Sequence, residues 1–385
     1  MKKLTRRDFL KVSMTGVGAL AMEQVLAACG QATPSPVPLA PTETNTPEAP
    51  AATPATPTAT PDARPIVAIG KADRYDQTQL RAELERMLQS LGGLADVIRP
   101  GAKVGIKVNM TGAYYQDGVT SPPATEWFAV NPALVGALCE LLIDAGAGQI
   151  SVVEGLGAAK PAVFDLWGYT DMATRVGADL VDLSYPDPYS DFADAPVGPG
   201  WFIHETYKLH PILTELDAFI SIGKMKSHSF AGVTLSMKNL MGITPLSVYK
   251  KYPGDTWRQS LHGDRQMDTR MPRVLLDLNR ARPIHLALVD GIWTSEGGAD
   301  PWEPDASQVK PGILLAGKSQ LATDAVGATV MGFNPVAPSG SVPFLHSENY
   351  LALAQEIGMG TIKLDEINLT GYQVQDVLYQ FKPAP

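Results

Sequence analysis

Residues 218–228 read Ala-Phe-Ile-Ser-Ile-Gly-Lys-Met-Lys-Ser-His, and this stretch decides the fold. Its first five residues are so apolar that they predict a strand buried on both faces, as in a parallel sheet. Ligands of open α/β sheets lie beyond the carboxyl ends of such strands. If the chain stays extended, Lys224, Lys226 and His228 share one side, because side chains alternate along a strand. The stretch therefore predicts both a buried sheet and a cationic site at its edge.

The rest of the chain alternates strand-like and helix-like patterns from about residue 64 onward. Strand patterns lie near 66–69, 103–109, 150–155, 180–183, 202–209, 218–222, 284–290 and 312–316. Helical patterns lie near 77–91, 131–145, 161–177, 272–281, 321–332 and 346–357. This alternation predicts an α/β fold with a mostly parallel, mixed sheet and flanking helices. We expect residues 64–385 to form a single large domain with long loop insertions at 184–200 and 244–270. These loops could be lids over a binding site or surface loops without a functional role.

The first residues are typical of an export address. Residues 5–11, Thr-Arg-Arg-Asp-Phe-Leu-Lys, match a twin-arginine signal, and Leu26-Ala-Ala-Cys29 is typical of a lipoprotein cleavage site. The alternative is a chance arginine pair before an ordinary signal peptide. We expect residues 1–28 to be a signal peptide read by the twin-arginine translocase, and Cys29 to carry lipid. The Thr/Pro/Ala-rich segment 29–63 would then tether the protein to the outer face of the cell membrane, or to an outer membrane if the cell has one.

Charge and cysteine content exclude several classes of function. The formal charge of −9 becomes −12 once the five basic and two acidic residues of 1–28 are removed. So acidic a body argues against nucleic acid as a partner, and it leaves the lipid as the only membrane contact. The chain has only two cysteines, so it lacks the ligands of an iron–sulfur cluster or a Cys-rich zinc site. Cys139 lies in an apolar helical pattern and is expected in the core.

Further polar residues follow the predicted strands, and parallel strand ends meet at one edge of a sheet. We expect the lysines and amides to bind an anion; the set is Lys107, Asn109, Lys224, Lys226, Lys238 and Asn239. The alternatives are a structural Lys107 that pairs with a carboxylate or extends its amine outward to solvent, and a solvated turn at 224–226. A glycine pair at 155 and 157 could bring backbone amides to a phosphate, but alone it is a weak signal.

His228 and two carboxylates complete the candidate site. Cations around His228 could depress its pKa, which leaves a neutral imidazole able to accept a proton, although a lone histidine is more often structural. Asp290 and Glu296 are carboxylates suited to a hard divalent cation. The alternative for Asp290-Gly291 is a plain turn. Asp324 fits the start of a helix, where the dipole favours a carboxylate.

Several of these pieces resemble a bacterial and archaeal family known as a domain of unknown function, DUF362. The resemblance covers roughly residues 104–333, and its segments are 104–109, 131–132, 152–155, 224–228, 232–242, 288–291, 296–298, 323–328 and 331–333. It implies no agreed reaction. Some relatives resemble iron–sulfur proteins through an added ferredoxin-type domain, but this chain lacks those cysteines, so the resemblance implies no such cluster here.

Two functions fit these observations. The first is an enzyme that acts on a small anionic substrate, a carboxylate or a phosphate, with Lys226 and His228 as catalytic residues and a divalent metal as an optional aid. The second is a non-catalytic solute-binding or scaffold lipoprotein that uses the same pocket. The sequence shows no division into two lobes, which a solute-binding protein would favour. It also contains no nucleophile elbow, P-loop, dinucleotide fingerprint or zinc-protease helix.

Overall fold

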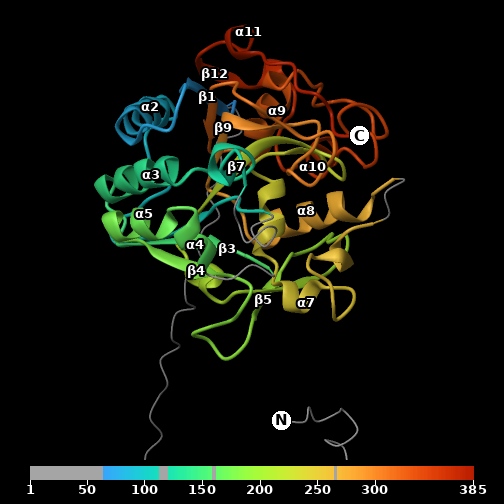
Figure 1. Ribbon diagram of the computed structural model, residues 1–385, viewed down its shortest axis with the longest axis horizontal. Helices are drawn as coiled ribbons and strands as arrows, with labels where there is room; N and C mark the ends of the chain where they lie inside the picture. Colours follow the sequence, from blue (N-terminus) through green and yellow to red (C-terminus); the bar gives the residue numbers. More distant parts are fainter. Residues whose placement is uncertain (1–63, 112–119, 158–161, 264–266) are drawn as a thin grey trace, which may run out of the picture. The chain divides into compact units, whose positions relative to one another are not determined.

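A ten-stranded mixed sheet forms the centre of the computed structural model, which describes residues 64–111, 120–157, 162–263 and 267–385. The twin-arginine motif, Cys29 and the tether lie outside the described residues. Along the sheet the strands are ordered β12-β1-β11-β9-β7-β2-β3-β4, with β10 paired to β9 and β8 paired to β7. Within the main order only β11 runs antiparallel to its neighbours. The predicted α/β class with a mostly parallel sheet is confirmed (Figure 1).

The strands of the large sheet are β1 (Ile66–Lys71), β2 (Lys103–Lys107), β3 (Gln149–Glu154), β4 (Asp179–Asp182), β7 (Ala218–His228), β8 (Gly232–Thr234), β9 (Leu286–Glu296), β10 (Ser307–Val309), β11 (Ile313–Gly317) and β12 (Asn368–Gly371). A separate hairpin pairs β5 (Ala193–Pro196) with β6 (Thr206–Leu209). The α-helices are α2 (Gln77–Ser90), α3 (Pro132–Asp144), α4 (Ala162–Leu166), α5 (Tyr169–Val176), α6 (Ile212–Glu215), α7 (Leu246–Tyr249), α8 (Arg270–Ala281), α9 (Gln320–Val330), α10 (Tyr350–Glu356) and α11 (Val374–Val377). Short 3-10 helices are η2 (Ala124–Glu126), η3 (Lys238–Ile243), η4 (Gln259–Leu261) and η5 (Leu364–Glu366).

Helices cover both faces of the sheet, and each face has its own apolar core. On one face α2, α3 and α5 pack against the alternate residues of β2 and β3, and on the other α8, α9 and α10 lie together (Figure 1). Cys139 of α3 is fully buried in the first core, as its apolar surroundings predict. Two buried faces explain why the central strands are apolar at nearly every position rather than at every second one.

Local sequence signals account for several of these elements. Asn131 caps α3, since its side chain accepts the N–H of Ala133 and Pro132 occupies the first turn, as predicted. Strand β7 lies between β2 and β9, and its residues from Ala218 to Ser227 are all buried. Because β7 is central, even its lysines lie inside the protein.

Three expectations about the elements were wrong in detail. The helix expected over 161–177 is broken at Gly168, whose φ of 74° is left-handed, into α4 and α5. The strand expected over 202–209 belongs to the β5–β6 hairpin rather than to the large sheet, so the expected loop 184–200 contains a strand. Both β7 and β9 run to eleven residues, well past the expected ends at 222 and 290.

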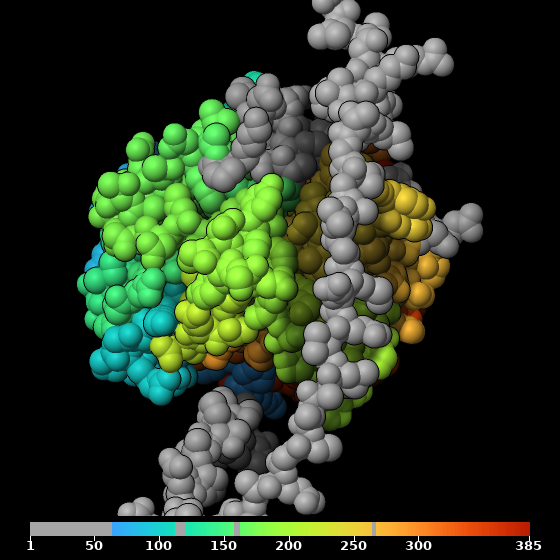
Figure 2. Space-filling model, turned by 90° about the horizontal axis from the view of Figure 1, so that it is seen from below, coloured from blue at the N-terminus to red at the C-terminus, as the bar shows by residue number. Residues whose placement is uncertain are grey.

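Much of one face of the molecule is formed by the middle of the chain. Figure 2 shows this face, where the green and yellow-green surface includes β4 and the β5–β6 hairpin. In the part of the chain that the structure describes, no helix is both long and apolar enough to cross a membrane.

Candidate functional site

The carboxyl ends of β2, β3, β7 and β9 carry the polar side chains of the candidate site. The structure divides them into three groups, each built around a lysine of the sequence prediction. Lysine has three N–H donors and no acceptor, so the count of donors already in use shows which lysine can still bind a ligand.

Lys107, at the end of β2, uses all its donors inside the protein. Its Nζ lies 2.8 Å from Oε1 of Glu154, 3.0 Å from Oδ1 of Asn239 and 2.6 Å from the carbonyl oxygen of Val108. Glu154 in turn accepts the N–H groups of Met110 and Gly155. Burial lowers the pKa of Lys107, while the carboxylate opposes that shift. This is the structural ion pair that the sequence left open as the alternative, so Lys107 has no donor left for an anion.

The two amides predicted to bind an anion belong to the same buried network. The Nδ2 of Asn239 donates to the carbonyl oxygens of Lys107 and Ile222 and to the hydroxyl of Ser221, at 3.0–3.1 Å. The Nδ2 of Asn109 donates to Oδ1 of Asn239 at 3.1 Å. The amides thus hold β2, β7 and η3 together; the protein itself occupies the donors of Asn239 and one donor of Asn109.

Lys224 forms a second group with Asp290 and Tyr75, which take two of its three donors. Its Nζ lies 2.8 Å from Oδ2 of Asp290 and 2.8 Å from the hydroxyl of Tyr75, and that hydroxyl lies 2.9 Å from Oδ1 of Asp290. Lys224 and Asp290 are fully buried. Burial lowers the pKa of Lys224 and raises that of Tyr75 well above its usual value. This buried triad holds β7 to β9 and to the segment before α2.

Lys226 and Lys238 form the third group, which is the open one. Lys226 is buried, and within the described ranges of the chain its Nζ has one partner, Oδ1 of Asp300 at 3.0 Å. Lys238, the first residue of η3, is half-buried and makes no hydrogen bond or ion pair with any residue that the structure describes. Two donors of Lys226 and all three of Lys238 therefore remain available to a ligand.

Lys238 and the neighbouring carboxylate of Glu303 both have pKa values close to neutral pH. Burial, with a smaller contribution from Lys226, lowers the pKa of Lys238 to about 8. Burial, then the charge of Asp300, raises the pKa of Glu303 to about 7. Both groups therefore change charge near neutral pH, where an acid–base catalyst works best.

Two histidines border this group, and their hydrogen bonds fix where each neutral ring carries its proton. Nδ1 of His228 accepts the N–H of Phe230 at 3.0 Å, so Nε2 carries the hydrogen. Nδ1 of His262 lies 3.0 Å from the carbonyl oxygen of Arg258, so it is the donor and Nε2 is the free acceptor. Burial, then Lys238, lowers the pKa of His228 well below its usual value, and burial lowers that of His262 to about 4. At neutral pH His228 is thus a hydrogen-bond donor and His262 an acceptor.

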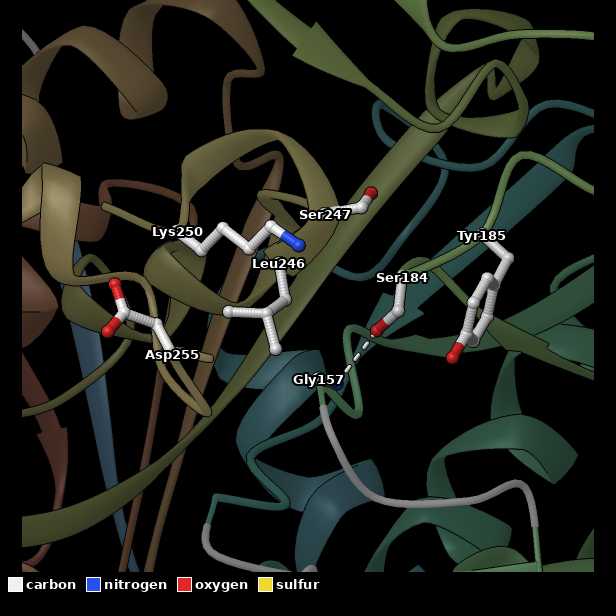
Figure 3. Close-up of a pocket in the computed structure, with 7 residues that line it drawn as sticks. All are labelled: Gly157, Ser184, Tyr185, Leu246, Ser247, Lys250 and Asp255. Atoms are coloured by element: carbon white, nitrogen blue, oxygen red, sulfur yellow. Dashed lines mark hydrogen bonds between the residues drawn. The ribbon is translucent and has the colours of Figure 1, made fainter. Parts of the chain in front are cut away.

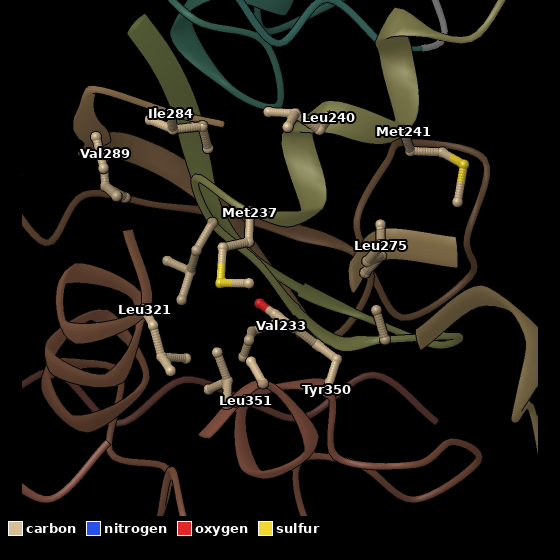
Figure 4. Packing of buried hydrophobic residues seen from close by; sticks show 14 of the residues in the cluster. Val233, Met237, Leu240, Met241, Leu275, Ile284, Val289, Leu321, Tyr350 and Leu351 are labelled. Carbon is tan, nitrogen blue, oxygen red and sulfur yellow. The ribbon is translucent and has the colours of Figure 1, made fainter. Parts of the chain in front are cut away.

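Segment η3 is held against the sheet by close backbone contacts. A Cβ added to Gly223 of β7 would meet the backbone of Leu235 and Ser236 at 2.5–2.8 Å, and one added to Gly242 would meet Nζ of Lys107 and Oε1 of Glu154 at 2.5 Å. Only glycine permits this approach at either position. Met237 and Leu240 lie in the buried cluster that also contains residues of α8, α9 and α10 (Figure 4). The packing of η3 and its flanking residues therefore fixes the position of Lys238.

Asp290 and Glu296, the expected metal ligands, do not come together. They lie six residues apart on one strand, a separation of roughly 20 Å. Asp290 is paired with Lys224, and Oε1 of Glu296 lies 3.5 Å from Nζ of Lys382. Among the residues that the structure describes, no group of three or more His, Cys, Asp or Glu could hold a metal ion.

A cavity of about 220 Å³ opens beside the ends of β3 and β4 (Figure 3). It is lined by Gly157, Ser184, Tyr185, Leu246, Ser247, Lys250 and Asp255. Both long segments that were expected as loops, 184–200 and 244–270, contribute to it. Gly157, from the glycine pair after β3, donates its N–H to Oγ of Ser184 at 2.7 Å, so this amide is not free for a phosphate.

Sequence reasoning missed four residues of the site: Tyr75, His262, Asp300 and Glu303. Each lies on a segment between regular elements, where no periodic pattern distinguishes it. Sequence signals existed only for His262, among the aromatic residues of 244–270, and for the acidic run that includes Asp300 and Glu303 after Gly297-Gly298.

One curated relative resembles this chain in sequence, and two solved structures resemble it in structure. In the curated relative found, the thylakoid-associated protein sll1697 of Synechocystis sp., 24% of residues are identical over 288 residues, which cover 74% of this chain and 79% of that protein. Two solved structures are similar at low levels: the lactate racemase apoprotein of Thermoanaerobacterium thermosaccharolyticum (12% identity, TM-score 0.40) and a Thermotoga maritima protein (11%, 0.34). The matches cover 71% and 65% of this chain but only 58% and 57% of those chains.

The family model described as "Domain of unknown function (DUF362)" matches residues 104–329, which contain every lysine of the three groups. The match coincides closely with the range 104–333 of the resemblance seen in the sequence. More than half of the chain lies within it. The chain therefore belongs to the DUF362 family.

Proposed function

We propose that the protein is an enzyme that binds a small anion, a carboxylate or a phosphate, between Lys226 and Lys238. The observation that carries this proposal is the amine of Lys238, which is half-buried, held in place by η3 and without a partner among the described residues. A cation in such a position lacks the hydration of the surface and gains from an anionic ligand.

The charges of the group support an anion rather than a cation. Lys226 and Lys238 bring two positive charges when protonated, and Asp300 pairs with one of them. Glu303 is partly protonated near neutral pH because its pKa is raised to about 7. The group therefore has an excess of positive charge that one bound anion would neutralise. The Nε2–H of His228 adds a neutral donor.

Proton transfer is the chemistry that the remaining groups support. Glu303 can donate or accept a proton near pH 7, and Nε2 of His262 can accept one. His228 acts in this proposal as a donor to the bound anion rather than as the base first expected from the sequence. If a divalent ion takes part, it would arrive with the substrate and contact Asp300 and Glu303, rather than Asp290 and Glu296.

The test is a thermal-shift screen of the full chain with phosphate, acetate and pyruvate, with and without Mg²⁺. We expect at least one anion to raise Tm, and Lys238→Ala to abolish the shift. The matched control is Lys103→Ala, an exposed lysine at the opposite end of β2. An equal shift in Lys238→Ala would refute the site. Anion binding with no turnover of any compound tested would favour the solute-binding alternative.

We further propose that the protein is exported by the twin-arginine translocase and anchored through lipid on Cys29. Support comes from the order and spacing of the arginine pair, the apolar stretch and the Leu-Ala-Ala-Cys motif. The Synechocystis relative is named as thylakoid-associated. Metabolic labelling with a radioactive fatty acid tests the proposal. Label should enter the wild-type protein and not Cys29→Ser, and label in both would contradict it.

A further inference from the structure

The amine of Lys238 is placed as a nucleophile as well as a cation. We propose that Lys238 forms an imine with the carbonyl carbon of a small 2-oxo acid whose carboxylate is bound by Lys226. This inference rests on the proposed function, because it uses the same anion site and names the class of substrate.

The geometry supplies the first argument. An amine attacks a carbonyl only when its nitrogen lone pair is free of internal partners, and Lys238 has no hydrogen bond or ion pair to the described residues. By contrast, Lys107 and Lys224 are paired with carboxylates at 2.8 Å. Strand pairing places Lys226 opposite Thr234, only four residues before Lys238, and the charge of Lys226 lowers the pKa of Lys238. One site thus holds a lysine suited to bind a carboxylate and another suited to react beside it.

The state of the amine supplies the second argument. Burial and the charge of Lys226 lower the pKa of Lys238 to about 8. At pH 7 about one amine in ten is then neutral, whereas an ordinary lysine has fewer than one in a thousand. Desolvation and a neighbouring cation are the established means by which proteins activate a lysine toward carbonyl compounds.

The chemistry balances without an oxidant or reductant. The neutral nitrogen of Lys238 adds to the carbonyl carbon, and one of its protons moves to the former carbonyl oxygen to give a carbinolamine. Glu303, with a pKa near 7, gives a proton to the departing hydroxyl, which leaves as water, and the resulting protonated imine can return its N–H proton to the Glu303 carboxylate. One amine and one carbonyl thus give one C=N bond and one water molecule. The imine acidifies adjacent C–H bonds, and Nε2 of His262 is an available acceptor for such a proton.

The site requires both functional groups of a 2-oxo acid. A hydroxy acid such as lactate offers a carboxylate to Lys226 but no carbonyl carbon to Lys238. A simple ketone such as acetone offers a carbonyl but no carboxylate. Pyruvate carries both on adjacent carbons, and it is the smallest stable probe of the proposal.

The experiment is reductive trapping. The full chain is incubated with pyruvate and sodium cyanoborohydride, which reduces an imine to a stable secondary amine, and peptide mass spectrometry locates the adduct. We expect one reduced pyruvate on Lys238, with at least about tenfold less from acetone and none from lactate. Lys238→Arg keeps the charge and should lose the adduct. An adduct confined to exposed lysines such as Lys250, or one that persists elsewhere unchanged in Lys238→Arg, overturns the imine.

A second variant and a second readout separate this inference from the proposed function. Lys226→Met should slow trapping by acetone somewhat, because loss of the neighbouring cation raises the pKa of Lys238, and should slow trapping by pyruvate about tenfold more, since only pyruvate has a carboxylate to bind. If pyruvate raises Tm through Lys238 but no adduct forms there, the imine is wrong and the anion site stands. If neither effect occurs, both are wrong. Thermal melts of each variant show that a lost adduct does not reflect unfolding.

Discussion

Oδ1 of Asp324 accepts hydrogen bonds from both the backbone N–H and the hydroxyl of Ser236, at 2.9 and 2.6 Å. Its Oδ2 accepts the N–H of Met237 at 2.9 Å. Asp324 lies within α9, one full turn past the capping residue Ser319, so the expected role at the helix start was wrong. It instead fixes the two residues that come directly before Lys238.

Replacing Asp324 with asparagine should disturb both stability and the site. An amide has one acceptor oxygen, and its NH₂ would face a backbone donor, so we expect a loss of about 2–3 kcal/mol in the free energy of unfolding. Anion affinity should fall about tenfold as Lys238 loses its fixed position. Urea unfolding and calorimetric titration measure the two effects. Ser236→Ala, which removes only the hydroxyl bond, is the matched control at about 1 kcal/mol, and normal affinity in Asp324→Asn would exclude the positioning role.

Removing one member of the buried Lys107–Glu154 pair should be costly. Lys107→Met leaves Glu154 buried without its cation, and we expect a loss of about 3–5 kcal/mol in unfolding free energy. The double variant Lys107→Met, Glu154→Gln should lose less than the sum of the two single changes, because no uncompensated charge remains. Denaturant unfolding of all four proteins measures the coupling. Strict additivity would mean that the two side chains do not interact.

Anion binding should weaken as pH rises from 6 to 9. Lys238, with a pKa of about 8, loses its positive charge over this range, and Glu303, with a pKa of about 7, gains a negative one. Both changes act against an anion, so affinity should fall at least tenfold. Calorimetry with phosphate-free buffers and acetate as the ligand follows the change without titration of the ligand itself. Glu303→Gln should remove the part of the fall near pH 7, and affinity independent of pH would contradict both assignments.

Replacing Lys238 with methionine should stabilise the protein at neutral pH while abolishing anion binding. The folded pKa of about 8 lies below the unfolded value of about 10.4, so folding opposes protonation of this amine. The resulting cost is fully present below pH 8 and disappears as pH rises toward 10.4. With allowance for partial screening by solvent, we expect a gain of about 1–2 kcal/mol at pH 7 and little at pH 10. Urea unfolding at both pH values is the measurement, and a larger gain at pH 10 would reverse the sign of the assignment.

The central strands and the start of α3 could be predicted because their signals are local. A five-residue apolar run and an Asn-Pro cap act within one element, whatever the rest of the chain does. The full length of β7 could not be predicted, since Lys224 and Lys226 read as solvent-exposed. They remain in the sheet only because Asp290 and Asp300, from distant parts of the chain, neutralise them. Burial of a charge depends on a partner that local sequence does not reveal.

The sequence indicated which strands carry the lysines of the candidate site, but not which of these lysines are already paired within the protein. The sequence placed Lys107 near a strand end, where it is found, and placed Lys224 and Lys226 just past a strand that instead continues through them to His228. It could not show that Lys107 and Lys224 are paired with carboxylates while Lys238 is not, because the difference lies in a few ångströms of tertiary geometry. The two-carboxylate metal hypothesis paired Asp290 with Glu296 by proximity in sequence, whereas an extended strand separates them.

The glycine at 242 has a consequence for engineering. Its α-carbon lies where a single methyl group would strike both members of the Lys107–Glu154 pair. A mutagenesis library that exchanges small residues would include Gly242→Ala as a conservative substitution. Here it would lift η3 away from the sheet and carry Lys238 with it. Attempts to redesign this protein should therefore keep residues 238–243 and the Lys107–Glu154 pair unchanged and vary the two long segments around them instead.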